Sequence, residues 1–165
     1  KGIKSMTDWQ LRDIHHIGMT VSDIDRSIEF YRDVLGMTLV GRREKVIENY
    51  VMKQTGYDGV QLSVASFRVR PDSPNSVEVV QYISHPRDPA DTASNRPGNT
   101  HLCIVVDDLR ASYEDLSAKG VKFRSDPVEI TAGPNKGGLV IYFYDPDNYI
   151  LEMFQPATGR SANGN

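Results

Sequence analysis

The pattern of apolar and polar positions along the chain repeats after 85 residues. Residues 16–24 read His-Ile-Gly-Met-Thr-Val-Ser-Asp-Ile and residues 101–109 read His-Leu-Cys-Ile-Val-Val-Asp-Asp-Leu, an offset of 101 − 16 = 85. Each stretch passes from an apolar strand to an aspartate, Asp23 or Asp108, whose carboxylate can accept the free N–H groups of a first helical turn. The pattern therefore predicts two copies of one structural unit.

An amphipathic helix is predicted after each aspartate, over residues 24–35 and 109–119, because apolar residues recur there three or four positions apart. Each predicted helix ends at a glycine, Gly36 or Gly120, which adopts a left-handed conformation at low cost. A short strand is expected after each glycine, over residues 37–40 and 121–124.

The two units also end alike, since Val77-Glu78-Val79 resembles Leu151-Glu152-Met153. This second offset is 152 − 78 = 74, so the first unit carries 85 − 74 = 11 extra residues, most of them expected within 44–57. Further strands are predicted over 61–69 and 139–144, bounded by Pro, Asp and Asn turn signals. Each unit thus reads as a strand, a helix and three more strands.

This order predicts an α+β fold of two βαβββ modules that form a cupped mixed sheet. We expect the first module over residues 12–84, a linker rich in Pro, Asp, Ser and Asn over 85–99, and the second module over 100–157, all within one domain. The small polar residues of 158–165 are expected to fray.

Composition narrows the classes of function. The 165 residues carry a formal net charge of −3, which argues against a nucleic-acid partner, and no apolar run approaches the roughly 18–20 residues of a membrane span. The single cysteine excludes an intramolecular disulfide and favours a cytoplasmic protein. Because Cys103 lies in an apolar run, we expect it to be buried and unreactive.

Each unit places a histidine in its first strand and a glutamate in its last. Taken singly, His16 reads best as a core histidine, and Glu78 or Glu152 could point to the solvated face of a strand. Four such residues in matching positions, with His101 as the fourth, favour a shared role. If the units face each other, two nitrogens and two oxygens converge, a set that suits one Zn, Ni, Co, Mn or Fe(II) ion.

These residues carry a resemblance to the vicinal oxygen chelate superfamily, which includes glyoxalase I, methylmalonyl-CoA epimerase, extradiol dioxygenases and the fosfomycin and bleomycin resistance proteins. The similarity runs from about residue 12 to residue 156, through 16–36, 76–81, 101–120 and 137–155. It implies paired βαβββ modules around a metal ion, in a homodimer. The superfamily's ligand positions fall on His16, Glu78, His101 and Glu152.

This full set of two histidines and two glutamates resembles glyoxalase I more than the extradiol dioxygenases, which bind iron with two histidines and one glutamate. Two positions depart from bacterial glyoxalase I. Thr20 stands where an arginine grips the glutathione carboxylate, and Tyr82 stands where an asparagine is usual. Lys136, in a Gly-rich stretch similar to the family's flexible loop, is a candidate contact for an anionic substrate.

The resemblance implies that a small-molecule substrate chelates the metal through two adjacent oxygens. We therefore expect a lyase or isomerase in which Glu152 or Glu78 moves a proton on a hydroxycarbonyl, thioester or thiohemiacetal substrate. The alternatives are an epimerase of the methylmalonyl-CoA type, Fe(II)-dependent ring cleavage by His16, His101 and Glu152, and a drug-binding resistance protein without catalysis.

Overall fold

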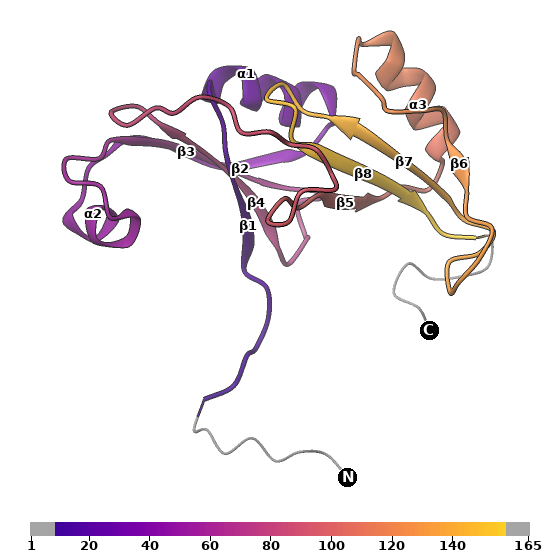
Figure 1. The fold of residues 1–165 in the computed structure, drawn as a ribbon, viewed down its shortest axis with the longest axis horizontal. Helices are drawn as coiled ribbons and strands as arrows, with labels where there is room; N and C mark the ends of the chain where they lie inside the picture. The colour runs from indigo at the N-terminus through magenta and orange to yellow at the C-terminus, as the bar shows by residue number, and fades with distance from the viewer. Residues whose placement is uncertain (1–8, 158–165) are drawn as a thin grey trace.

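The first half of the chain forms one four-stranded mixed sheet, here called sheet A. The structure is a computed structural model that describes residues 9–157, so the polar end at 158–165 lies outside the described residues. The strand order in sheet A is β1-β4-β3-β2 (Figure 1), with β1 (His16–Thr20), β2 (Thr38–Val46), β3 (Leu62–Arg68) and β4 (Ser76–Tyr82).

The second half forms sheet B, whose order β5-β8-β7-β6 repeats that of sheet A. Its strands are β5 (Leu102–Val105), β6 (Val128–Glu129), β7 (Leu139–Tyr144) and β8 (Ile150–Gln155). In both sheets the first strand lies at an edge and runs parallel to the last strand, while the other pairs are antiparallel. The α+β fold of two equivalent units is confirmed, as two separate sheets.

Both predicted helices form at the predicted places. The first is α1 (Ile24–Ile28), which continues as the π-helix η1 (Glu29–Val34), and the second is α3 (Leu109–Ala118). Asp23 and Asp108 each accept a backbone N–H at 3.0 Å, as N-caps do. No helix within residues 9–157 has the length and apolar character that a membrane crossing needs.

A glutamine ties the last strand of each unit to its helix. Gln81 accepts the N–H of Ile24 at 3.1 Å, and Gln155 accepts the N–H of Leu109 at 2.8 Å. Both glutamines lie three residues after the unit's glutamate, so they point to the opposite face of the sheet. The repeat therefore extends to the contacts that orient each helix.

The short strands predicted after the helices differ from those observed. The expected strand at 121–124 is reduced to an isolated bridge between Phe123 and Phe143, flanked by backbone hydrogen bonds from Arg124 N–H to the Tyr142 carbonyl and from Tyr144 N–H to the Lys122 carbonyl. Its first residue, Val121, bonds back to Leu116 in the helix, and Pro127 interrupts any continuous pairing before β6. In the first unit the strand is longer than expected and runs to Val46, with two register shifts against β3.

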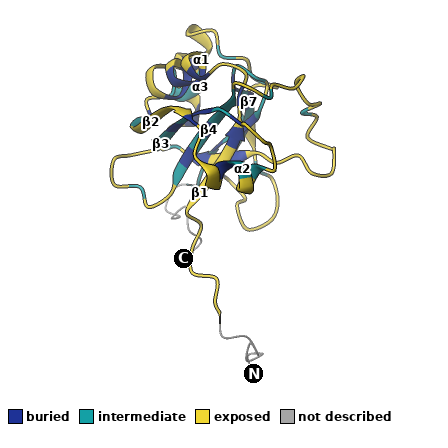
Figure 2. Ribbon diagram, turned by 90° about the vertical axis from the view of Figure 1, so that its left-hand side faces the viewer, coloured by how far each residue is buried: buried dark blue, intermediate teal, exposed yellow. Residues whose placement is uncertain are grey.

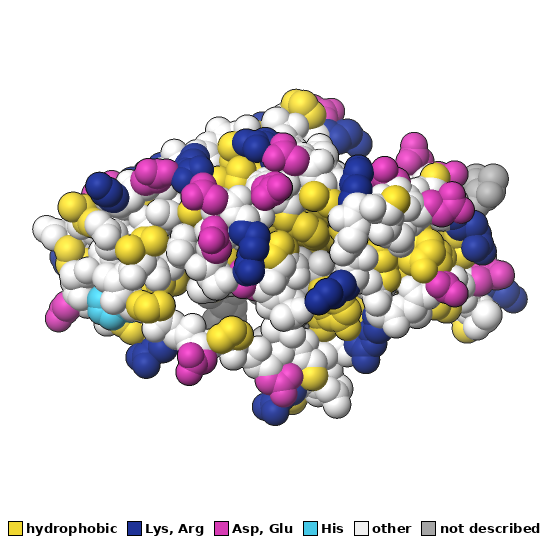
Figure 3. All heavy atoms as spheres, turned by 90° about the horizontal axis from the view of Figure 1, so that it is seen from above, with side chains coloured by type: hydrophobic (Ala, Val, Ile, Leu, Met, Phe, Trp, Pro, Cys, Tyr) yellow, Lys and Arg dark blue, Asp and Glu magenta, His cyan; other side chains and the backbone are white. Residues whose placement is uncertain are grey.

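The helices cover one face of the two sheets, and the main core lies there. Residues from both halves contribute to this cluster, including the fully buried side chains of Tyr31, Phe67, Leu109, Phe143 and Leu151. Figure 3 shows acidic and basic side chains interspersed over the surface that carries the helices. Ion pairs of the chain include Arg26–Asp147, Arg42–Asp25 and Lys119–Asp115.

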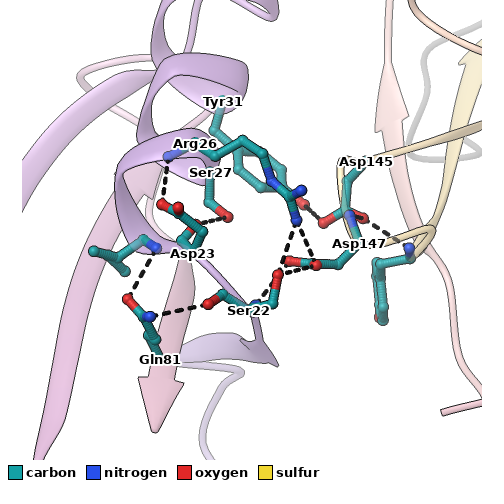
Figure 4. A network of polar contacts seen from close by, with 10 residues as sticks. Ser22, Asp23, Arg26, Ser27, Tyr31, Gln81, Asp145 and Asp147 are labelled. Atoms are coloured by element: carbon teal, nitrogen blue, oxygen red, sulfur yellow. Dashed lines mark hydrogen bonds and ion pairs between the residues drawn. The ribbon is translucent and has the colours of Figure 1, made fainter. Parts of the chain in front are cut away.

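A polar contact joins the two halves through the turn that precedes β8 (Figure 4). The Tyr31 hydroxyl donates to Asp145 at 3.0 Å, and Asp145 is only 5% exposed. The other Asp145 oxygen accepts the backbone N–H groups of Asp147 and Tyr149. Burial raises the pKa of the Asp145 carboxyl, while these three hydrogen bonds oppose the rise.

Asp147 adds a second contact between the halves in the same turn. Its carboxylate accepts the backbone N–H and the hydroxyl of Ser22, and it pairs with the Arg26 guanidinium at 2.6 Å. Because both aspartates reach residues of the first unit, the turn fixes the position of sheet B against α1.

Replacing Tyr31 by Phe removes the hydroxyl donor that reaches Asp145 from the first unit. We expect the free energy of unfolding in urea to fall by about 1–3 kcal/mol, because a buried carboxylate loses a partner. Tyr113→Phe is the control, since the Tyr113 hydroxyl also donates to an aspartate, Asp126, but at an exposed site. Its effect should stay within about 0.5 kcal/mol. Equal losses in the two variants would contradict a buried contact between the halves.

Candidate metal-binding site

His16 and Glu78 lie on the face of sheet A that the helices leave uncovered. Glu78 is opposite Gly18 on one side and Ser66 on the other. Residues opposite each other point to the same face, whereas their neighbours along the strand point to the core. Phe67 is accordingly fully buried while Ser66 is half-buried. We call the uncovered face of each sheet, which carries the histidine and the glutamate, its ligand face.

The first histidine and glutamate form a loose pair. His16 Nε2 lies 3.6 Å from Glu78 Oε2, and the two side chains are 43% and 27% exposed. The Ser66 hydroxyl donates to the other oxygen, Glu78 Oε1, at 3.1 Å. One carboxylate oxygen is therefore held by the neighbouring strand, and the other faces the imidazole.

The second pair is tighter, and its glutamate is more shielded from solvent. His101 Nε2 lies 2.8 Å from Glu152 Oε2, and the Glu152 side chain is 16% exposed. Glu152 is opposite Cys103 and Tyr142, and the Tyr142 ring centre lies 5.3 Å from that of His101. The two glutamates thus occupy matching positions in the repeat but have different neighbours.

The four predicted ligands come together as two pairs. Within residues 9–157 of a single copy, no group of three or more His, Cys, Asp or Glu side chains is close enough to hold an ion. Each pair presents one imidazole nitrogen and one carboxylate oxygen on a partly exposed face, and these donors suit a borderline divalent ion. Each pair fits half of a mixed nitrogen and oxygen site.

Cys103 differs from its prediction. It is exposed on the ligand face of sheet B beside Glu152, so the expectation of a buried thiol is wrong. Partial desolvation, together with the charge of Glu152, raises the pKa of Cys103 to about 12. The thiol therefore stays protonated near neutral pH, which disfavours a nucleophilic role, in agreement with the sequence-based expectation.

The extra residues of the first unit cover one end of the ligand face of sheet A. They form α2 (Asn49–Thr55), and Val51 of this helix packs in a second small core with Val46, Val60 and Leu62. The neighbouring residues on the face that carries Ser66 and Glu78 pack against that core, namely Val64, Val80 and Tyr82. The insertion predicted within 44–57 is therefore a wall beside the pair of His16 and Glu78.

The three predicted substrate contacts lie in different places. Thr20 is exposed at the end of β1, opposite Val80 on the ligand face. Tyr82 lies at the end of β4 beside the α2 wall. The centre of its ring lies 5.9 Å from the centre of the Tyr57 ring, and the two rings are nearly perpendicular. Lys136 is exposed in the loop that joins β6 to β7, so it belongs to the other sheet.

Two residues next to the glutamates were not predicted from the sequence. Ser66 and Tyr142 are not part of any motif, and each becomes a neighbour of a glutamate only through the pairing register. The two-residue period of the strand places Ser66 on the same face as Leu62 and Val64. Only the register with β4 places it opposite Glu78.

Shortening Val51 to Ala tests whether α2 is a packed wall. Because Val51 is 3% exposed in the small core, we expect a loss of about 1–3 kcal/mol, seen as faster amide hydrogen exchange in α2 and at the end of β3. The matched control is Val105→Ala, since Val105 is 49% exposed and should change stability by less than about 0.5 kcal/mol. Unchanged exchange in the Val51 variant would show that α2 is not held by this core.

Comparison of the sequence with known proteins identifies the family to which the chain belongs. Residues 13–153 match the family model described as the Glyoxalase/Bleomycin resistance protein/Dioxygenase superfamily. A lactoylglutathione lyase of Haemophilus influenzae is 30% identical over 154 residues, which cover 92% of this chain and 98% of that protein. A 2-epi-5-epi-valiolone epimerase of an Actinomyces species is 28% identical over 149 residues, which cover 88% of this chain and 80% of that protein.

A solved structure agrees with the fold. The crystal structure of a glyoxalase family protein from Bacillus cereus superposes with a TM-score of 0.79 at 20% sequence identity, and covers 93% of this chain and 99% of that one. At this identity the likeness concerns the arrangement of the two modules.

Proposed function

The chain belongs to the glyoxalase, bleomycin resistance protein and dioxygenase superfamily, and we propose that it is a metal-dependent lyase or isomerase of the glyoxalase type. The observation that carries this proposal is the pair of one histidine and one glutamate on each ligand face, at 3.6 and 2.8 Å. Two equivalent pairs with the same donors are what a single four-donor site requires.

We propose that the four donors meet between two copies of the chain. Within one copy the pairs lie on separate sheets, so the ligand face of sheet A has to meet a sheet B face from elsewhere. The ligand face of sheet B supports such a contact. A row of apolar residues crosses all four of its strands next to Glu152, consisting of Val105, Phe154, Val140 and Val128.

The exposure of this apolar row favours a homodimer. Val105 is 49% exposed and Val128 is 50% exposed, although both are large apolar side chains on a regular sheet. Contiguous apolar surface of this kind marks a protein interface or a ligand site. Covering the row with a second copy would also shield the glutamate beside it from water.

In this assembly His16, Glu78, His101 and Glu152 would hold one divalent ion. The ion supplies Lewis acidity, which lowers the energy of negative charge developing on substrate oxygens. The glutamates supply proton transfer, because a carboxylate next to the substrate can take a proton from one carbon and return it to the adjacent carbon. Ser66 keeps one oxygen of Glu78 in place during that exchange.

The substrate we favour is a small hydroxycarbonyl, thiohemiacetal or thioester. Thr20 is opposite Val80 on the ligand face and Tyr82 packs against the α2 core, and neither supplies the cationic group that a glutathione carboxylate would need. Epimerisation is the second candidate, because one relative is named an epimerase and both reactions move a proton at carbon. Lys136 remains the candidate for an anionic group of the substrate.

Mixing two inactive variants tests the site between copies. One variant carries His16→Ala and Glu78→Ala, and the other carries His101→Ala and Glu152→Ala. Each alone should bind no ion tightly. After subunit exchange, half of the dimers are mixed and one of their two sites is intact, so high-affinity zinc binding should return to about a quarter of the wild-type level. If the mixture binds no more zinc than the separate variants, the proposed arrangement is wrong.

Solvent exchange tests the reaction class. With the metal-loaded protein in deuterium oxide, we expect deuterium to enter the carbon next to the carbonyl of an α-hydroxycarbonyl, a hemithioacetal or an acyl-CoA, followed by proton NMR. Glu152→Gln should slow this exchange by about 10²-fold or more, because it removes a base without changing shape. Glu129→Gln, on the exposed strand β6, is the control and should exchange like the wild type.

Other outcomes would assign a different function. Oxygen uptake with a catechol by the Fe(II)-loaded protein, without proton exchange, would identify ring cleavage. Tight binding of a planar drug by the metal-free protein, with no turnover of any of the three substrate classes, would identify a resistance protein.

A further inference from the structure

The chain approaches the first ligand through an extended segment that leaves its own copy. Residues 9–15, here called the N-terminal arm, are all exposed and run away from the two sheets (Figures 1 and 2). The contact that ends the arm on sheet A is the backbone bond from Ser76 N–H to the His15 carbonyl, at 3.3 Å. The next residue is His16, so the arm leads directly to the proposed site.

The arm carries large apolar side chains that are mostly exposed to solvent. Leu11 is 92% exposed, Ile14 is 62% exposed and Trp9 is 65% exposed. Three large apolar residues within six positions of an extended segment are unusual for a surface that faces only water. The polar residues Gln10, Arg12 and Asp13 lie among them, and the extended segment is able to lie along another surface.

We propose that the N-terminal arm packs against a second copy of this chain and helps to hold the dimer together. This inference rests on the proposed site between two copies. There, His16 has to face the sheet B of the partner copy, so the arm that precedes it begins at that interface. The apolar row that includes Val105 and Val128 offers exposed surface on that sheet for Leu11 and Ile14.

The position of β1 at the edge of sheet A also supports a contact between the N-terminal arm and a second copy. In sheet A the strand lies at the edge, and β4 pairs with it on one side only. Its outer edge and the arm that extends it are therefore open to another chain, whereas β2 and α2 lie at the opposite edge. A partner that covers the ligand face from the β1 side meets the arm first.

The single tryptophan of the chain makes the arm directly observable, because Trp9 is the only tryptophan in the sequence. The wild-type chain is diluted through its dimer dissociation constant, which sedimentation measures in parallel. The emission maximum of Trp9 should lie at shorter wavelength in the dimer and shift to longer wavelength as the dimer dissociates. An emission maximum that is the same in both states would overturn the proposal.

Charge substitutions give an independent readout. Leu11→Asp and Ile14→Asp should each raise the dimer dissociation constant about tenfold or more, because each removes a buried apolar side chain and places a charge in the interface. The control is Val40→Asp, since Val40 is also 48% exposed but lies in β2 at the opposite edge of sheet A. Its dissociation constant should match that of the wild type.

The outcomes separate this inference from the proposed function. A wild-type dimer that binds zinc, with arm variants that dimerise equally well, would overturn only the role of the arm. A dimer weakened by the arm variants but unable to bind zinc would overturn the metal site and leave the arm as an interface element. A wild-type chain that stays monomeric would contradict both.

Discussion

The alternation of side chains across the two sheets is the constraint on which the rest of the structure depends. Because successive residues of a strand point to opposite faces, each sheet has to bury one face and expose the other. The buried face packs against α1, η1 and α3, and the aspartate and glutamine contacts at the helix starts fix those helices in place. The opposite face is then free to carry His16, Glu78, His101 and Glu152. A shift of one residue in either register would move the glutamate into the core.

The two modules repeat the same plan, but their ligand faces differ in ways that matter chemically. Glu78 is opposite glycine and serine, and one of its oxygens accepts a hydrogen bond from Ser66. Glu152 is opposite cysteine and tyrosine and lies closer to its histidine. The surface around Glu78 is therefore open and polar and ends at the α2 wall, whereas an apolar row lies next to Glu152. Such complementary faces suit a site that forms when one covers the other.

The two helices and the four ligand residues could be predicted from the sequence, because the repeat encodes them in local patterns. The apolar periods, the capping aspartates Asp23 and Asp108, and the two offsets define both helices and the pairing of each histidine with a glutamate. The reduction of the expected strand at 121–124 to a single bridge, the exposure of Cys103 and the neighbours Ser66 and Tyr142 could not be predicted, since they depend on register and on contacts distant in sequence. The separation of the four ligands into two pairs also depends on how the modules pack, through Tyr31, Asp145 and Asp147, which no local pattern reveals.

The central claim is that two histidines and two glutamates hold one ion. X-ray absorption spectroscopy of the zinc-loaded protein tests it most directly, because imidazole nitrogens, carboxylate oxygens and sulfur scatter differently around the metal. We expect two imidazole ligands with oxygen donors and no sulfur, and a shell reduced to one imidazole in the His16→Ala variant. A sulfur ligand from Cys103, or a shell of oxygen atoms without imidazole, would contradict it.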